Sequence, residues 1–92
     1  MLNFESKSRL PNLITRSSKL PLHHQLYDLL RGKIRSGEWI EGQMIPTEQE
    51  LIDQYGVSRI VIRQVLNRLV NEGLIFRQQG RGSFVAERRL EE

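Results

Sequence analysis

Residues 57–85 constrain the fold most, because a capped amphipathic helix is followed at once by a glycine-rich hairpin. Ser58 is a favoured N-cap residue, and Gly73 suits the position after the last helical turn, where positive φ is common. Between them the apolar residues follow the i, i+3, i+4, i+7 spacing of a buried helix face, namely Ile62, Val65, Leu66 and Leu69. This pattern predicts a helix over residues 58–72.

The opposite face of this helix carries polar and basic side chains. At roughly 100° per residue, Val61 lies at the edge of the apolar stripe, and the far side holds Ile60, Arg63, Gln64 and Asn67. Arg59 precedes Arg63 by one turn, in the part of a recognition helix that usually contacts base edges. Two arginines on a helix are often only solvated surface, but the flanking motifs favour contact with a DNA major groove.

A second helix is predicted directly upstream. Thr47 and Glu50 form the S/T-x-x-E pattern of a capping box, and Leu51, Ile52 and Tyr55 provide an apolar face. Gly56 permits a sharp turn and Val57 fills the gap between the helices, so residues 47–72 predict a helix-turn-helix.

The hairpin runs from Leu74 to Val85, with its tip at residues 79–82. Glycines at the tip allow the backbone to approach a phosphate closely, and Arg77 and Arg81 add positive charge. The alternative is that the glycines serve turn geometry only, and the two interpretations are compatible.

The first firm helix is predicted over residues 22–36, with Pro21 near its start and Gly37 near its end. Its basic residues Arg31, Lys33 and Arg35 suit either the helix dipole or DNA contact. We expect Trp39 and Ile40 to pack under the fold. Residues 43–45 could add a short third strand to the hairpin, which a two-stranded hairpin needs for stability.

Composition limits the function classes. The chain has 92 residues, enough for one small domain, and no cysteine, which excludes disulfides and thiolate metal sites. No apolar run approaches the ~20 residues of a membrane span. His23 and His24 are adjacent and point about 100° apart on a helix, so they make a poor metal pair. We expect no enzyme activity, no metal and no cofactor, and cytoplasmic residence.

The net charge of +3 is weak evidence, but its distribution is stronger. Residues 58–85 contain five arginines and one acidic residue, whereas residues 38–57 contain five acidic residues and no Lys or Arg. The basic side is therefore the 58–72 helix and the hairpin, where phosphates would lie.

These motifs together resemble the N-terminal winged helix-turn-helix of GntR-family bacterial transcription regulators. The matching residues, in order, include Pro21-Leu22-His23-His24-Gln25-Leu26, Ile45-Pro46-Thr47-Glu48, Tyr55-Gly56-Val57-Ser58-Arg59, Ile62-Arg63, Glu72-Gly73-Leu74-Ile75 and Gly80-Arg81-Gly82-Ser83-Phe84-Val85. The resemblance covers residues 20–86 and is greatest to the HutC subgroup. It implies an α+β, mainly helical fold with three helices and a small β wing.

The resemblance also implies a repressor, less often an activator, that binds a palindromic operator as a homodimer and is released by a small-molecule effector. The effector would bind a C-terminal domain that these residues do not include. The chain is then either a DNA-binding fragment, monomeric by itself, or a single-domain member of the family. Residues 1–19 are expected to form a mobile arm, or a short docking helix that uses Phe4, Leu10, Leu13 and Ile14, and residues 87–92 a linker stub.

The sequence departs from the family at several positions. Where the family usually has Tyr, Ser and Thr, this chain has His23, Thr47 and Val61. Val61 cannot donate the backbone-phosphate hydrogen bond that a threonine makes there. At Gln49 some members have an arginine that contacts a base, and glutamine would do so more weakly.

The expected partner is double-stranded DNA, with no membrane. The expected DNA-contacting residues are Thr47, Gln49, Ser58, Arg59, Ile60, Val61, Arg63, Gln64, Asn67, Gln79, Gly80, Arg81, Gly82 and Ser83. The main alternative is a winged helix used for protein–protein interaction, which would not explain the arginines at the helix start. RNA binding is less favoured because no exposed aromatic platform is evident.

Overall fold

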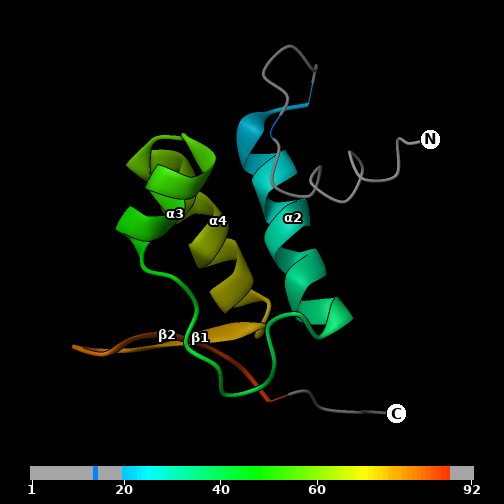
Figure 1. Cartoon of the computed structure of the whole chain (residues 1–92), viewed down its shortest axis with the longest axis vertical. Helices are drawn as coiled ribbons and strands as arrows, with labels where there is room; N and C mark the ends of the chain where they lie inside the picture. The colour runs from blue at the N-terminus through cyan, green and yellow to red at the C-terminus, as the bar shows by residue number, and fades with distance from the viewer. Residues whose placement is uncertain (1–13, 15–19, 88–92) are drawn as a thin grey trace.

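The computed structural model describes residue 14 and residues 20–87. Three helices, α2 (Leu22–Ser36), α3 (Glu48–Tyr55) and α4 (Arg59–Asn71), precede a hairpin of β1 (Ile75–Gln78) and β2 (Gly82–Val85). The hairpin lies at one end of the α2–α4 pair (Figure 1). The predicted α+β winged helix-turn-helix is confirmed.

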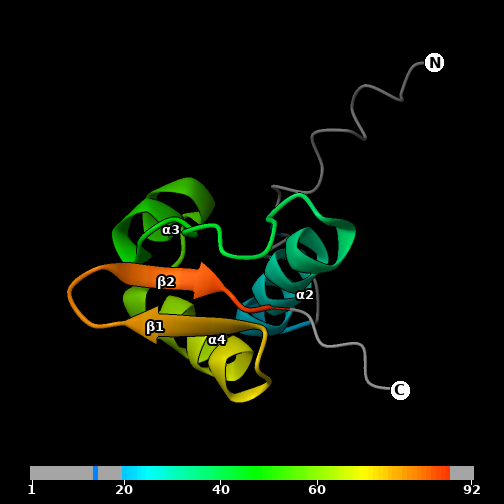
Figure 2. The same ribbon diagram turned by 90° about the horizontal axis from the view of Figure 1, so that it is seen from below.

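Helix α2 has the bounds that the sequence predicts. Pro21 precedes it with φ −59°, and Gly37 ends it with φ 87°, donating its N–H to the Ile34 carbonyl. Its buried side chains follow helical spacing and face α4, namely Leu26, Tyr27, Leu30 and Ile34. Figure 2, a view from below, shows the hairpin in front of α4 with α2 to its right.

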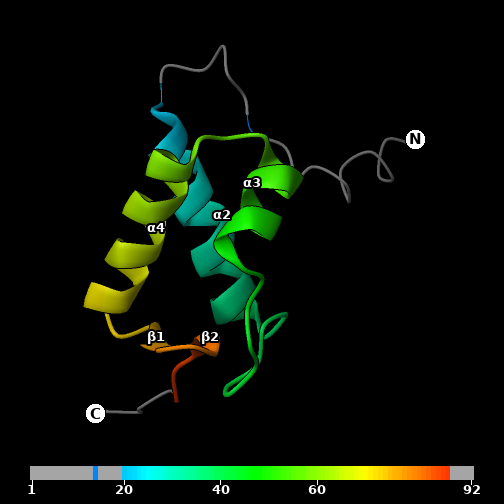
Figure 3. The same cartoon turned by 90° about the vertical axis from the view of Figure 1, so that its left-hand side faces the viewer.

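Helices α3 and α4 form the helix-turn-helix. The predicted capping box is present, since Glu50 N–H donates to Thr47 Oγ1 at 3.1 Å and Thr47 N–H donates to Glu50 Oε1 at 2.8 Å. Gly56 turns the chain with φ 67°, and Val57 is buried between the helices. Ser58 caps α4 by accepting the Val61 N–H at 3.2 Å. Figure 3 shows the turn between α3 and α4 at the end away from the sheet.

The wing is an antiparallel hairpin in which Ile75 pairs with Val85 and Phe76 with Phe84. The predicted third strand over residues 43–45 is reduced to one bridge between Met44 and Phe84. Backbone hydrogen bonds of 2.9 Å from Val85 N–H to Gln43 and from Ile45 N–H to Ser83 flank it. The segment cannot lengthen, because the Gly42 turn precedes it and Pro46, which has no N–H, follows.

One hydrophobic core joins the three helices and the hairpin. Trp39 is buried as predicted, but the expectation for Ile40 is wrong, because 62% of its surface is exposed. Ile40 begins a turn, in which Gln43 N–H donates to its carbonyl at 3.0 Å, and its side chain lies outside the core that covers Trp39. No helix within residues 20–87 is long and apolar enough to cross a membrane.

Candidate nucleic-acid interface

The outer face of α4 presents the side chains expected to contact DNA. Arg59, Ile60 and Arg63 are exposed, as are Gln64 and Asn67 further along the helix. Val61 is half-buried and packs against the core, in agreement with its place at the edge of the apolar stripe. The Ser58 hydroxyl is occupied as an acceptor by the helix cap.

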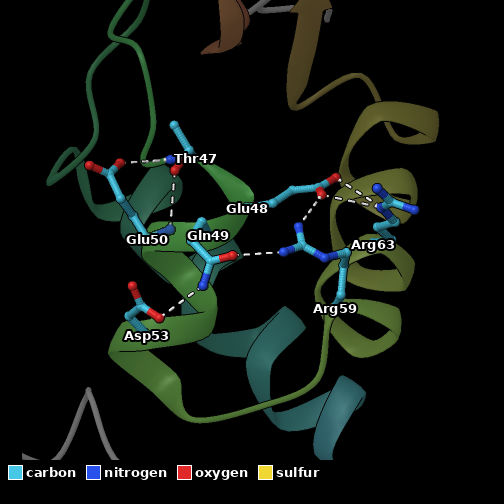
Figure 4. Close-up of polar contacts among 7 residues, drawn as sticks. All are labelled: Thr47, Glu48, Gln49, Glu50, Asp53, Arg59 and Arg63. Carbon is cyan, nitrogen blue, oxygen red and sulfur yellow. Dashed lines mark hydrogen bonds and ion pairs between the residues drawn. The ribbon is translucent and has the colours of Figure 1, made fainter.

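The start of α3 lies across from these arginines (Figure 4). Arg59 Nη1 donates to Glu48 Oε1 at 3.2 Å, and Arg59 Nη2 donates to Gln49 Oε1 at 2.7 Å. Arg63 Nε donates to both carboxylate oxygens of Glu48, at 3.2 and 3.3 Å. Gln49 also donates to Asp53 at 3.0 Å. The fold therefore brings together the predicted residues Gln49, Arg59 and Arg63, and adds Glu48.

Glu48 was not among the predicted site residues, because an acidic residue in the first turn of a helix is explained by the dipole alone. Its pairing also corrects the charge argument. The acidic segment 38–57 is not separate from the basic face, since Glu48 lies between the two arginines of α4. Arg59 and Arg63 lie 11 and 15 residues after Glu48, and helical periodicity within one element cannot predict a contact between side chains of two different helices.

The wing tip is a three-residue loop, residues 79–81, with Arg81 N–H donating to the Gln78 carbonyl at 2.9 Å. Gln79, Gly80 and Arg81 are exposed, whereas Gly82 and Ser83, predicted as part of the contact surface, belong to β2. Gly82 has φ 132°, and a Cβ there would lie 3.2 Å from Met44 Sδ. The positive φ favours glycine at this position, and the exposed Met44 side chain would have to shift slightly to admit a Cβ.

A hollow joins the start of α3 to the wing, and its lining includes Thr47, Glu48, Arg77 and Gln79. Thr47 is exposed at its rim, and its hydroxyl accepts the Glu50 N–H. The helix-turn-helix and the wing therefore share one concave side.

A second feature outside the predicted site joins α2 to the end of α4. The Tyr27 hydroxyl donates to Glu72 Oε1, and the Arg68 guanidinium carbon lies 3.7 Å from the centre of the Tyr27 ring. Arg68 also donates to Glu72 at 3.3 Å. The hydrogen bond from Tyr27 lowers the pKa of the Glu72 carboxyl, and Arg68 lowers it further against the effect of burial.

A helix-turn-helix followed by a two-stranded wing, with arginines exposed on its second helix, defines a winged-helix DNA-binding domain. The family model of bacterial regulatory proteins of the gntR family matches residues 22–85. The chain therefore belongs to the GntR family.

Curated relatives agree. The repressor NagR of Bacillus subtilis is 39% identical over 79 residues, covering 86% of this chain and 32% of that protein. The histidine utilization repressor of Klebsiella aerogenes is 43% identical over 72 residues, covering 78% of this chain and 30% of that protein. The chain thus spans about a third of the length of these relatives, which are transcription regulators rather than enzymes.

Among solved structures, the AraR DNA-binding domain in complex with operator ORX1 matches with a TM-score of 0.71 and 43% identity. The match covers 73% of this chain and 81% of that chain. Within residues 20–87, no group of three or more His, Cys, Asp or Glu side chains could hold a metal.

Proposed function

We propose that this chain binds a specific duplex DNA sequence, with α4 in the major groove and the wing at the minor groove or its flanking phosphates. One observation carries the proposal: Glu48, which lines the hollow between the start of α3 and the wing, pairs with both exposed arginines of α4. Arg59 and Arg63 are the side chains that contact bases, and guanine is the favoured base because its O6 and N7 accept both hydrogen bonds of a guanidinium. The AraR DNA-binding domain, which has a similar fold, was solved in complex with an operator, and this supports duplex DNA as the partner.

The remaining contacts of the proposal are backbone and groove-wall contacts. Thr47, Gln49 and Ser58 lie at the two helix starts, Gln64 and Asn67 further along α4, and residues 79–83 on the wing. Phosphate contacts position a protein on the duplex, and base contacts give it specificity.

The proposal extends to the regulator as a whole. We infer a repressor that binds a palindromic operator as a homodimer, acts in the cytoplasm where a bacterial operator lies, and responds to a small-molecule effector bound outside the winged helix. The names of the relatives, which are repressors, support the sign of regulation.

Selection of bound sequences from a random duplex library tests the proposal. We expect a defined half-site for the wild-type chain, and Arg63→Ala should lower the ratio of selected to scrambled affinity by the equivalent of about 1–3 kcal/mol. Arg35→Ala, which removes the same charge from the exposed end of α2, is the matched control. An unchanged ratio for Arg63→Ala would exclude Arg63 as a base-contacting residue.

A further inference from the structure

Arg63 is held at one edge only. Its Nε donates to both oxygens of Glu48, at 3.2 and 3.3 Å, and among the described residues no hydrogen bond reaches its terminal nitrogens. Figure 4 shows Glu48 on the Nε side of this guanidinium. The side chain is 60% exposed. The two nitrogens that would form a bidentate pair with guanine O6 and N7 are thus the ones left available.

Arg59 is held in the opposite way. Each of its terminal nitrogens donates one hydrogen bond, Nη1 to Glu48 at 3.2 Å and Nη2 to Gln49 at 2.7 Å. Each of these nitrogens keeps a second N–H, so Arg59 can still contact a base or a phosphate, but two protein partners fix the orientation of its terminal nitrogens. The two arginines therefore differ in which nitrogens are held by protein partners, although both side chains lie on one face of α4.

Glu48 is itself well fixed. It is the first residue of α3 and follows Thr47, whose backbone and hydroxyl both take part in the capping box with Glu50. Its side chain is only 30% exposed. A carboxylate held at a helix start in this way orients its partners better than a mobile surface residue would, because less side-chain entropy remains to be lost.

We propose that Glu48 is a positioning residue for base recognition, an inference that rests on the proposed function. It orients Arg63 so that the terminal nitrogens face the groove, and it competes with phosphates for one N–H of Arg59 Nη1. The negative charge of Glu48 also repels the phosphates of any DNA. On the matched sequence, hydrogen bonds from the arginines to a correctly placed guanine offset this repulsion, and on unmatched DNA nothing does. Glu48 thus increases specificity at some expense of affinity.

The test uses the full chain and the duplex selected by the wild type, with a scrambled duplex of the same composition. The base pair assigned to Arg63 is the one whose preference Arg63→Ala loses. At that position guanine is replaced by 7-deazaguanine, which lacks the N7 acceptor. Three variants are compared, with thermal unfolding as the check of folding. They are Glu48→Gln, Glu48→Asp and the control Glu50→Gln, which removes one charge from the same helix turn and keeps a side chain that capping boxes accept.

We expect the wild type and Glu50→Gln to prefer guanine over 7-deazaguanine at this position by about five-fold or more. Glu48→Gln should bind the scrambled duplex more tightly than the wild type does. Its preference for guanine should fall to about two-fold or less, because the neutral glutamine side chain accepts only a weak hydrogen bond from Arg63 Nε. Glu48→Asp keeps the charge but shortens the reach, so its preference should fall in the same way.

A Glu48→Gln variant that keeps the wild-type preference for guanine would overturn the inference. A second result would also overturn it. If Glu48→Asp kept the wild-type preference for guanine, and Glu48→Gln and Glu50→Gln lost that preference equally, the charge of this helix turn would explain the preference without any positioning by Glu48. A wild-type chain that selects no sequence would instead contradict the proposed function. The two failures are therefore distinguishable.

Discussion

At the scale of single residues, Ile60 is the clearest departure from ordinary surface chemistry. It lies between Arg59 and the half-buried Val61 on the outer face of α4, and 73% of its surface is exposed, more than for any other large hydrophobic residue within residues 20–87. An apolar side chain on the groove-facing side of a recognition helix can contact a thymine methyl group. The alternative is that Ile60 only shields the start of the helix.

Replacing the key thymine of the selected site by uracil separates these interpretations. We expect the wild type to lose about four-fold in affinity, corresponding to about 0.8 kcal/mol for one buried methyl group, and Ile60→Ala to lose almost nothing. Both affinities come from titration of the same pair of duplexes. Equal weakening of the two proteins would show that Ile60 does not contact the methyl group.

At the scale of elements, the junction of α2 and α4 depends on Tyr27, Arg68 and Glu72. The pKa of Glu72 lies below its ordinary value of 4.5, first because of the Tyr27 hydrogen bond and then because of Arg68. A lowered carboxyl pKa stabilises the fold above pH 4.5, and this contribution is lost as pH falls through the lower, folded-state pKa.

Tyr27→Phe should therefore destabilise the chain at pH 7 by about 1 kcal/mol, below the usual range for a hydrogen bond to a charged group because the Glu72 side chain is 38% exposed to solvent. The difference from wild type should shrink as pH is lowered from 5 to 3, measured by denaturant unfolding. Tyr55→Phe is the control, since the buried Tyr55 hydroxyl has no hydrogen-bond partner among the described residues. A difference that stays constant down to pH 3 would show that Glu72 is not the acceptor that matters.

The wing is the second element with a functional prediction. Arg81 lies on the exposed loop, its guanidinium carbon 5.8 Å from the centre of the Phe84 ring. A phosphate contact would make Arg81→Ala weaken all sequences equally and lower the salt slope by about one unit. We expect a loss of preference for flanking A·T pairs as well, because a narrow minor groove attracts an inserted arginine.

Arg81→Lys distinguishes the two contacts. A phosphate contact tolerates lysine, whereas insertion into the minor groove favours the planar guanidinium, so we expect the A·T preference to fall while the salt slope is kept. Selection from a library randomised beside the half-site measures both quantities. If Arg81→Ala changes neither affinity, slope nor preference, the wing has a structural role only.

At the scale of the whole molecule, the described surface offers little for self-association. The exposed large hydrophobic residues within residues 20–87 are Leu20, Ile40, Met44, Ile60 and Phe76. Met44 and Phe76 lie on either side of Phe84, and these three side chains fall well short of the roughly 800 Å² per partner of a stable interface.

Sedimentation of the 92-residue chain at micromolar concentration should therefore show a monomer, which binds one half-site weakly. Two copies on one duplex gain affinity only when they are linked, because the second contact then becomes intramolecular. A tight dimer would contradict this prediction. The expectations for residues 1–13, 15–19 and 88–92 lie outside the described residues, although Ile14 packs against the core.

The amino-acid sequence determined the elements of this protein, because their signals act over a few residues. The Thr47–Glu50 capping box, the Ser58 cap and the glycines after each helix define α2, α3 and α4 to within a cap residue. The period of the apolar residues likewise predicted the buried face of α4, and therefore the exposed face with Arg59 and Arg63.

Only the tertiary structure decided how those exposed arginines are held. The angle at which α3 crosses α4 depends on how Leu51, Val57 and Ile62 pack, and no local pattern encodes it. That packing places Glu48 beside both arginines, and the packing of α2 on α4 places Tyr27 beside Glu72, 45 residues further along the chain. The sequence thus specified which side chains are available for DNA, and the packing of the helices specified which of their nitrogens have protein partners.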